Sequence, residues 1–337
     1  MEFTTDDVLL VTGATGLVGS HVLQYALQRG IRTRAFVRQA GGTQTHDRGD
    51  AVQVVGDMTD RESLRQAVNG ATVIVHCAAK VGDWGPVEEY REVNVRGLET
   101  LLEEAEAAGS LRRFIHISSL GVYEVRDHYG TDETEPMNAN GIDGYTLSKV
   151  ESEQLVVRHI AEKQLPATIL RPGFIYGPRD RTVLPRILER LRDEKFAYLG
   201  SGEKLMNNTF VGNVVDAVFA AIERDESIAE IYNITDNRLV TKREFITTIA
   251  ESAGYPIPTK KVPLGMARAI AKTLEATWRL LGKQEAPLLS GARIKFLGLN
   301  LDFCIDKARR ELGYAPQTDF TIAMQQTIDW FREQKIV

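Results

Sequence analysis

The feature that most constrains the fold of this chain is the stretch "VLLVTGATGLVG" at residues 8–19. Residues 8–12 are apolar or β-branched, as in a buried strand. They run directly into Gly13, Gly16 and Gly19, where a helical pattern (19–30) begins. A glycine-rich turn between a strand and a helix lets an anion approach the backbone N–H groups and the positive end of the helix dipole. The stretch therefore predicts a βα unit with a phosphate-binding turn.

The rest of the first half repeats this alternation of strand and helix. Further strand patterns occur at 33–37, 51–55, 72–78, 112–119 and 167–172, and helical patterns at 61–70, 90–109 and 145–163. Strands that alternate with helices form right-handed βαβ units and hence a parallel sheet covered on both faces. We expect an α/β fold with a Rossmann-type doubly wound sheet in residues 1–175, joined by a return strand near 229–235. A smaller, mostly helical substrate-binding lobe is expected in residues 176–337.

Composition narrows the class of protein. The chain has 337 residues and a formal net charge of −5, without the basic footprint of a nucleic-acid-binding protein. No apolar run approaches the ~18 residues of a membrane span, and the start "MEFTTDD" lacks the pattern of a signal peptide. Cys77 and Cys304 lie far apart and offer no metal-ligand spacing. We expect a cytoplasmic protein without a metal site.

The Gly-x-x-Gly-x-x-Gly spacing within a βαβ pattern predicts a dinucleotide cofactor. The second strand pattern runs "RAFVRQAGG" and ends at Arg38, without the acidic residue that would accept a hydrogen bond from the ribose 2′-hydroxyl of NAD. A guanidinium group suits the 2′-phosphate of NADP. We therefore expect NADP(H), with NAD(H) as the alternative if Arg38 is only a solvated surface residue.

Tyr145 and Lys149 lie four residues apart in the segment 145–163, which places both on one face of a helix. An ammonium group near a phenol lowers the phenol pKa from about 10, as a proton donor and acceptor requires. By itself, an amphipathic surface helix explains this spacing more often than catalysis does. The strand pattern that ends in Ser118 and Ser119 favours a site, because the carboxyl ends of parallel strands face the ligand crevice.

Eight motifs in order support a family resemblance: "TGATGLVG", "GDMTD", "HCAA", "VNVRGLETLLEEA", "ISSLGVY", "YTLSK", "RPGFIYGP" and "NTFVGNVVDAV". Over nearly its whole length the chain resembles the extended short-chain dehydrogenase/reductase superfamily, that is, the NAD(P)-dependent epimerase/dehydratase superfamily. The segments "HCAAKVGDWG" and "FCIDKARRELGYAPQTDF" are most similar to 3β-hydroxysteroid dehydrogenase-like enzymes and ketone reductases. Dihydroflavonol reductase-like members share the arginine at the end of the second strand.

The resemblance implies roles for individual residues. Ser119, Tyr145 and Lys149 would be catalytic, with Tyr145 as general acid/base and Asn94 as support for the active-site backbone or its water. The cofactor would contact Thr12, Gly13, Thr15, Gly16, Leu17, Val18, Gly19, Arg38, Asp57, Met58, Cys77, Ala78, Ala79, Tyr145, Lys149, Pro172 and Ile175. The expected substrate contacts are Lys80, Asp83, Trp84, Ser119 and Tyr176. For Asp83 and Trp84 the alternative is a structural loop packed by the tryptophan.

The motifs together predict an NADP(H)-dependent oxidoreductase. It would transfer hydride between nicotinamide and a secondary alcohol or ketone of fairly apolar, steroid-, flavonoid- or long-chain-ketone-like character. The alternative is a nucleotide-sugar epimerase with tightly bound NAD, in which Arg179, Arg181, Arg186, Lys204 and Arg243 could bind a diphosphate. A dehydratase is disfavoured because Leu120 and Gly121, rather than an acid pair, follow the serine.

The segment 265–282 has the pattern of an amphipathic helix, with Met266, Ile270, Leu274, Trp278 and Leu281 on one stripe. Core packing is the first interpretation. A lid over an apolar substrate or a peripheral membrane contact are the alternatives. The resemblance also implies a homodimer, formed through helices that flank the sheet.

Overall fold

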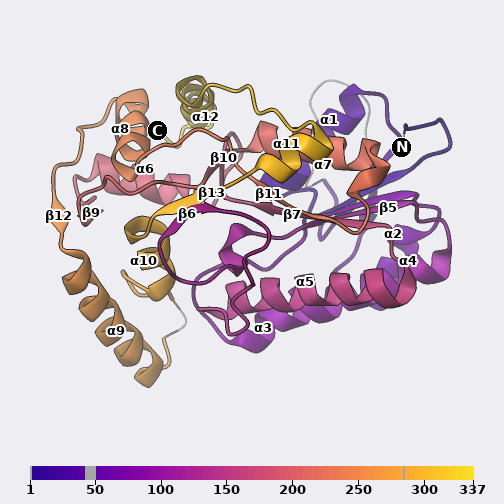
Figure 1. Ribbon diagram of the computed structural model, residues 1–337, viewed down its shortest axis with the longest axis horizontal. Coiled ribbons are helices and arrows are strands. Elements are labelled where there is room, and N and C mark those ends of the chain that lie inside the picture. The colour runs from indigo at the N-terminus through magenta and orange to yellow at the C-terminus, as the bar shows by residue number, and fades with distance from the viewer. Residues whose placement is uncertain (1, 42–50, 284) are drawn as a thin grey trace.

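The computed structural model describes residues 2–41, 51–283 and 285–337. Its centre is a seven-stranded sheet in the order β11-β7-β5-β4-β1-β2-β3, in which every neighbouring pair is parallel (Figure 1). The strands are β1 (Leu9–Thr12), β2 (Thr33–Val37), β3 (Val52–Val55), β4 (Val73–His76), β5 (Arg113–Ile117), β7 (Ala167–Pro172) and β11 (Ile231–Ile234). The strand order reverses between β1 and β4, where sheets of this kind bind ligands. The predicted Rossmann-type fold class is confirmed.

Helices cover both faces of the sheet because successive strand residues point to opposite sides. Leu9 and Val11 belong to the core beneath α1 (Leu17–Gln28), α7 (Val211–Glu223) and α11 (Asp306–Leu312). Leu10 belongs to the core of the other face, beneath α2 (Arg61–Val68), α4 (Gly97–Ala108) and α5 (Gly144–Lys163). Figure 1 shows these two helical layers above and below the sheet.

The C-terminal half also contains a second core. It is formed largely by α6 (Leu184–Arg192), α8 (Lys242–Ala253) and α12 (Phe320–Glu333). Beside it lie α9 (Leu264–Leu280) and α10 (Gly291–Gly298), which share a small apolar cluster. Outside the central sheet, the described residues form three parallel pairs of short strands. They are β8 (Phe174–Tyr176) with β10 (Asn208–Phe210), β9 (Tyr198–Leu199) with β12 (Lys261–Val262), and β6 (His128–Thr131) with β13 (Leu301–Phe303).

The structure differs from the sequence pattern in two places. The helix expected at 90–109 starts earlier, as α3 (Val87–Arg91), a π-helical turn (Glu92–Arg96) and α4 in unbroken succession. The strand expected at 229–235 is β11, which joins the central sheet. Helices α7 and α11 of the C-terminal half also pack against this sheet, which the sequence pattern did not predict. Across the described residues, no helix is both long and apolar enough to cross a bilayer.

Candidate active site

The glycine turn lies between β1 and α1, at the point where the strand order reverses. Gly13 has a φ of +66°, and a Cβ there would lie 2.7 Å from the backbone nitrogen of Ala78. A Cβ at Gly19 would collide with the Gly13 carbonyl. Gly16 caps α1 without a side-chain hydrogen bond, and the first turn of the helix holds no acidic residue. This backbone cradle and the open positive end of the helix dipole fit the pyrophosphate of a dinucleotide.

The residues around the turn divide into an exposed set and a structural set. Thr15 is exposed and Leu17 half-buried, whereas Val18 packs into the core. Thr12 is fully buried, where its hydroxyl lies 2.8 Å from Nδ1 of His76 and accepts a 3.2 Å hydrogen bond from the Ala78 N–H. Thr12 therefore joins the ends of β1 and β4 rather than offering a surface to a ligand.

The end of β4 forms the opposite wall of the turn. Cys77, Ala78 and Ala79 follow the strand and are half-buried. Burial raises the pKa of the Cys77 thiol to about 12, so this side chain is neutral at physiological pH. The segment provides a small, uncharged surface beside the glycine cradle.

Arg38 and Asp57 lie together at the carboxyl ends of β2 and β3. Arg38 is exposed directly after β2. Hydrogen bonds from the Thr59 backbone and hydroxyl lower the pKa of Asp57, and the charge of Arg38 lowers it further. Met58 is buried, and its carbonyl oxygen packs against Gly97 of α4. This rim places one cation and one anion where the sequence predicted the adenosine end of the cofactor.

The two serines after β5 have different environments. Ser118 is buried and its hydroxyl donates a 2.7 Å hydrogen bond to Oε2 of Glu153. Ser119 is half-buried, begins the 3₁₀ turn Leu120–Val122, and its Oγ accepts a 3.0 Å hydrogen bond from the Gly121 N–H. Because that oxygen is the acceptor, the Ser119 proton is available to another oxygen. Of the two serines, Ser119 is therefore the one with a hydroxyl proton left for a ligand, and its catalytic role stays a prediction.

Tyr145 and Lys149 lie on α5, whose first turn is fixed by a capping box. Asp143 accepts a 2.7 Å hydrogen bond from the Thr146 N–H, and the Thr146 hydroxyl accepts one from the Asp143 N–H. Lys149 is buried, and its ammonium donates a 2.8 Å hydrogen bond to the carbonyl of Ile117 at the end of β5. Burial lowers the pKa of Lys149 to about 8.

The expected lowering of the phenol pKa by Lys149 is not seen in this structure. Burial, followed by the charge of Asp143, raises the pKa of Tyr145 to about 12. A hydrogen bond with Ser119 acts in the opposite direction and lowers this pKa. The reason is that the lysine ammonium is directed to the Ile117 carbonyl, while the nearest anion to the phenol is the capping carboxylate. The phenol is consequently protonated at neutral pH.

Asn94 lies in the π-helical turn and joins three elements of the site. Its side chain accepts a 2.7 Å hydrogen bond from the Lys80 N–H and donates to the Lys80 carbonyl (3.0 Å) and to the Ser148 hydroxyl (2.8 Å). π-helical turns inside helices often occur at functional sites. The position agrees with the expected support of the active-site backbone.

A buried polar network lies behind the catalytic face. Glu153, two turns after Tyr145 on α5, forms an ion pair with Arg171 of β7, and both side chains are almost inaccessible to solvent. Arg171 also donates a 2.7 Å hydrogen bond to the Tyr123 hydroxyl, which in turn donates to Asn233 of β11 at 2.9 Å. This network, which sequence reasoning missed, fixes α5 against β7 and β11. A charged residue within the apolar strand 167–172 was the available signal.

The expected substrate residues do not all reach one surface. Ser119 and the loop after β4 lie at the carboxyl edge of the sheet, but Lys80 forms an ion pair with Glu89 and Asp83 one with Arg293 of α10 at 2.8 Å. Trp84 donates a 2.9 Å hydrogen bond to the Lys283 carbonyl. Tyr176 is fully buried in the second core, where its hydroxyl donates to Asp236. The structure therefore does not bring Tyr176 to the site.

Pro172 and Ile175, the expected nicotinamide contacts, lie where the chain leaves the sheet. Pro172 ends β7 and is buried, whereas Ile175 is half-buried in β8. Ile175 packs against the core that also holds Val11 and Val18 from either side of the glycine turn.

Lys295 is a residue of the site that the sequence did not indicate. It projects from α10 and donates 2.9 Å hydrogen bonds to the carbonyls of Gly121 and Tyr123, which flank the turn after Ser119. Burial lowers the pKa of Lys295 to about 8, and its charge also acts on Asp143. This lysine joins the second lobe to the segment that carries Ser119. No local pattern marks a lysine whose partners lie more than 170 residues away.

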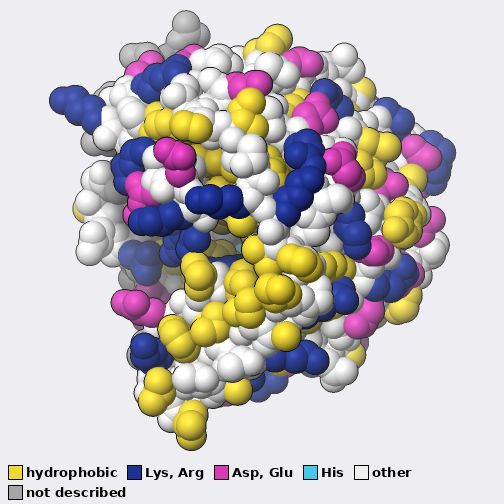
Figure 2. Space-filling model, turned by 90° about the vertical axis from the view of Figure 1, so that its left-hand side faces the viewer, with side chains coloured by type: hydrophobic (Ala, Val, Ile, Leu, Met, Phe, Trp, Pro, Cys, Tyr) yellow, Lys and Arg dark blue, Asp and Glu magenta, His cyan; other side chains and the backbone are white. Residues whose placement is uncertain are grey.

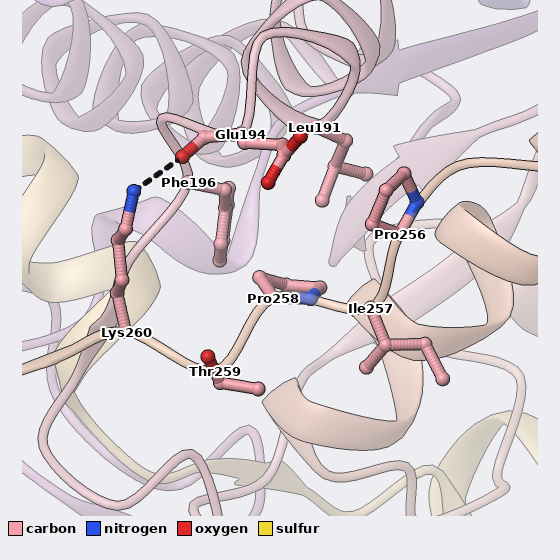
Figure 3. Close-up of a pocket in the computed structure, with 8 residues that line it drawn as sticks. All are labelled: Leu191, Glu194, Phe196, Pro256, Ile257, Pro258, Thr259 and Lys260. Atoms are coloured by element: carbon pink, nitrogen blue, oxygen red, sulfur yellow. Dashed lines mark hydrogen bonds between the residues drawn. The ribbon is translucent and has the colours of Figure 1, made fainter.

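The cleft drawn in Figure 3 lies apart from these residues. It is formed by the end of α6 and by residues 256–260, where Lys260 donates a 2.7 Å hydrogen bond to the Glu194 carbonyl. None of its lining residues is a predicted site residue. Within the described ranges, His, Cys, Asp and Glu side chains do not form a group of three or more that could hold a metal ion.

Comparison with known proteins places this geometry in a family. The model of the NAD dependent epimerase/dehydratase family matches residues 9–235. The chain is 33% identical over 325 residues to a 4-hydroxy-2-methyl-3-oxo-4-farnesyl-3,4-dihydroquinoline-1-oxide ketoreductase of Stigmatella aurantiaca, covering 96% of this chain and 95% of that protein. It is 27% identical over 335 residues to the human decarboxylating sterol-4-alpha-carboxylate 3-dehydrogenase, covering 97% and 89%.

Solved structures agree with this placement. The chain is 32% identical to the protein in the crystal structure of gox2253 and matches that structure with a TM-score of 0.82. The match covers 98% of this chain and 99% of that one. A UDP-glucose 4-epimerase of Thermotoga maritima, at 22% identity and a TM-score of 0.77, covers 97% of this chain and is itself covered to 99%. This second likeness shows the fold alone.

The chain belongs to the NAD dependent epimerase/dehydratase family. The expected membership in the extended short-chain dehydrogenase/reductase superfamily is thereby confirmed. The chain is accordingly an enzyme of the oxidoreductase class, in a family that uses a nicotinamide dinucleotide.

Proposed function

We propose that the protein is an NADP(H)-dependent reductase or dehydrogenase that interconverts an apolar ketone and a secondary alcohol. The observation that carries this proposal is the placement of Ser119, Tyr145 and Lys149 at the carboxyl edge of the sheet, beside the glycine cradle. A bound nicotinamide dinucleotide supplies or accepts the hydride. The protein side chains must then hold the substrate oxygen and move one proton.

The protonation states suit a reduction. Because the pKa of Tyr145 is raised to about 12, the phenol carries its proton at neutral pH and can donate it to the oxygen of a ketone as that oxygen becomes an alkoxide. The Ser119 hydroxyl donates a hydrogen bond to the same oxygen and stabilises the developing charge. Lys149, whose pKa is about 8, is largely cationic at neutral pH and attracts the phenolate that is left.

The preference for NADP(H) rests on Arg38, which is exposed at the end of β2. Its guanidinium would form an ion pair with the 2′-phosphate of NADP. The neighbouring Asp57 carboxylate would repel that phosphate. Arg38→Ala should raise the KM for NADPH by about 10- to 100-fold, the value of a charged hydrogen bond, and leave the KM for NADH nearly unchanged. Equal effects on both cofactors would contradict the preference.

An apolar ketone is the proposed substrate because the two relatives described above carry a farnesyl group or a sterol in their names. The rival, a nucleotide-sugar epimerase, needs cations for a diphosphate. Three of the five candidates are already engaged: Arg179 donates to Ser20 and Gln24, Lys204 pairs with Asp127, and Arg243 with Glu203.

The deciding experiment measures NADPH consumption over a panel of long-chain 3-oxo compounds, ketosteroids and UDP-sugars. The proposal expects stoichiometric NADPH oxidation with a subset of the ketones. Interconversion of UDP-sugars without net consumption of cofactor would overturn it in favour of the epimerase.

A further inference from the structure

Helix α9 stands at the margin of the molecule and is held by a narrow contact. Only Ala267 and Ala271 of this helix are buried. Met266 is 56% exposed, Ile270 40% and Leu280 87%. Core packing, the first interpretation of the 265–282 pattern, is therefore wrong for most of the helix, because two alanines offer little surface to the body. Figure 1 shows α9 projecting from the lower left of the molecule.

Three exposed apolar side chains of α9, Met266, Ile270 and Leu280, lie on one side of the helix, with Thr273 and Thr277 between them. These five positions follow one another at intervals of four and three residues, the spacing of a single helical stripe. Leu281 and Leu288 continue the exposed apolar surface beyond the end of the helix. Figure 2, which views the molecule from the α9 side, shows apolar side chains gathered over the lower part of this face with basic side chains around them.

The charge of this segment is opposite to that of the whole chain. Residues 260–283 contain six basic residues and one acidic residue, Glu275, in a protein whose formal net charge is −5. The basic residues are Lys260, Lys261, Arg268, Lys272, Arg279 and Lys283. At about 3.6 residues per turn, Arg268, Lys272 and Arg279 lie on the side of α9 away from this stripe. An apolar face combined with a polar face rich in lysine and arginine is the pattern of a helix that lies in the interface of a membrane with anionic lipids.

We propose that α9 docks this enzyme onto the surface of an anionic lipid bilayer, with its axis parallel to the membrane. A second copy of the chain is a poorer occupant, because a symmetric contact through α9 would bring together two copies of a segment with six basic residues and one acidic residue. In a membrane interface, acyl chains would lie beneath Met266, Ile270 and Leu280, and the anionic headgroups that surround the helix would attract the lysines and arginines of its polar side.

The end of α9 contacts the loop that borders the candidate active site. Trp84 donates its indole hydrogen bond to the Lys283 carbonyl, and the Arg279 guanidinium lies 5.5 Å from the Trp84 ring centre. Tyr90, which donates a 2.7 Å hydrogen bond to the Trp84 carbonyl, packs against Gly144, the neighbour of Tyr145. A docked α9 therefore places this edge of the site at the lipid surface, where an apolar ketone is dissolved. This last step rests on the proposed function.

The test is co-sedimentation of the purified protein with two kinds of vesicle, phosphatidylcholine alone and phosphatidylcholine mixed with phosphatidylglycerol. We expect binding to the mixed vesicles, weakened by salt, and little binding to phosphatidylcholine alone. The double variant K261E/K272E should weaken binding about 25-fold or more, since each basic residue near an anionic surface contributes about fivefold. R32E/R158E, which changes the net charge equally at exposed positions outside the patch, is the matched control and should retain binding.

The apolar stripe has its own variant. M266S/I270S should also release the protein from mixed vesicles, whereas I322S, at an exposed isoleucine of α12, should not. Equal loss in variant and control would overturn the proposal, as would absence of binding to the mixed vesicles. A change of sedimentation mass caused by M266S/I270S, without vesicle binding by the wild type, would assign the face to a second copy and equally overturn it.

Activity measurements separate this proposal from the proposed function. NADPH oxidation with a short, water-soluble ketone and no vesicles should be the same in K261E/K272E and the wild type. If the wild type binds mixed vesicles but reduces no ketone, the proposed function fails and the docking surface stands. If it reduces ketones but does not bind the vesicles, the docking surface fails alone.

Discussion

Helices α5 and α9 are of similar length, but the body of the protein holds them in different ways. α5 has 20 residues, begins in a capping box, and directs Lys149, Ser152 and Glu153 inward, each with a hydrogen-bond partner. α9 has 17 residues, begins without a side-chain cap, and buries two alanines. The helix that carries the candidate chemistry is fixed in rotation and in position along its axis. The helix at the margin is held by the small apolar cluster around its two alanines and by a hydrogen bond from the Gly291 N–H to Glu275.

Polar contacts explain why the two helices differ in this way. A buried hydrogen bond or ion pair has a preferred direction, so it specifies how a helix is rotated, whereas apolar contact alone tolerates repacking. A catalytic phenol must be placed to within about half an ångström. A helix that places no side chain in the candidate site, such as α9, has no such requirement.

The largest effect is expected at Tyr145, the proposed proton donor on α5. Tyr145→Phe removes the only hydroxyl of that side chain and leaves the ring that packs beside it. We expect kcat for ketone reduction to fall by about 10²- to 10⁴-fold, the contribution of a placed proton donor, with NADPH affinity nearly unchanged. Tyr129→Phe, at a tyrosine that is 72% exposed, is the control. Steady-state kinetics and NADPH fluorescence titration measure both quantities, and retained turnover would remove Tyr145 from this role.

The second prediction concerns the anchor of α5 rather than its chemistry. Glu153→Gln leaves the Arg171 guanidinium buried without a carboxylate, which costs about 3–5 kcal/mol of unfolding free energy. Glu162→Gln, on the exposed face of the same helix, should change it by less than about 0.5 kcal/mol. Urea unfolding followed by circular dichroism compares the two variants. Equal midpoints would mean that the ion pair does not anchor the helix.

The parts of the molecule that were predictable from sequence are those set by local pattern. The strands at 33–37 and 167–172 have the predicted bounds, and α5 begins one residue before the predicted position. Apolar runs, glycines and capping residues act over a few positions, so a pattern can be read directly. The placement of Ser119 beside Tyr145 was also predictable, because parallel strands end at the same edge of the sheet.

Long-range partners were not predictable. Lys295 reaches Gly121 across 174 positions, and the Arg171–Glu153 pair depends on the packing of α5 against β7. The expected lowering of the Tyr145 pKa by Lys149 does not occur, because the lysine ammonium is bonded to the Ile117 carbonyl while burial and the charge of Asp143 raise that pKa. Core packing, the first of the three interpretations of the α9 pattern, was wrong for most of the helix because the same periodicity describes a helix on a core and a helix with an exposed apolar face.

A third prediction concerns α10, which is held less firmly than α5 and more firmly than α9. Two buried lysines hold it: Lys242, and Lys295 of the helix itself. Lys242 donates a 2.7 Å hydrogen bond to the Phe296 carbonyl of α10, and burial lowers its pKa from 10.5 to about 7. Between these two values the unfolded chain binds more protons than the folded one, so this lysine makes the protein more stable as pH rises from about 7 to 10. The contribution is lost as pH falls through 7.

Lys242→Met should therefore flatten the rise of unfolding free energy with pH by up to about 1.4 kcal/mol per pH unit. Lys272→Met, at an exposed position of α9, should leave the slope unchanged. Urea unfolding at pH 7, 8 and 9 measures the slopes. Parallel curves for Lys242→Met and the wild type would show that the lysine does not titrate in this range.

The first residue of α5 and the second residue of α9 are both glycines and form a matched pair. In α5, a Cβ at Gly144 would lie 2.6 Å from Cδ2 of Tyr90 and 3.3 Å from Cα of Val87. Gly144→Ala should therefore cost about 1–3 kcal/mol, as overpacking does, and should lower kcat because it displaces the adjacent Tyr145. An unchanged unfolding midpoint would show that Tyr90 moves aside freely.

The smallest effect is expected at the corresponding glycine of α9. A Cβ at Gly265 would meet nothing within 4 Å, and the backbone there is helical. Gly265→Ala should therefore change the unfolding free energy by about +0.5 kcal/mol or less, in the stabilising direction, since alanine loses less backbone entropy in a helix. The same substitution is thus expected to have opposite signs in the two helices. A loss above 1 kcal/mol at Gly265 would mean that α9 is packed against the body far more closely than its two buried alanines indicate.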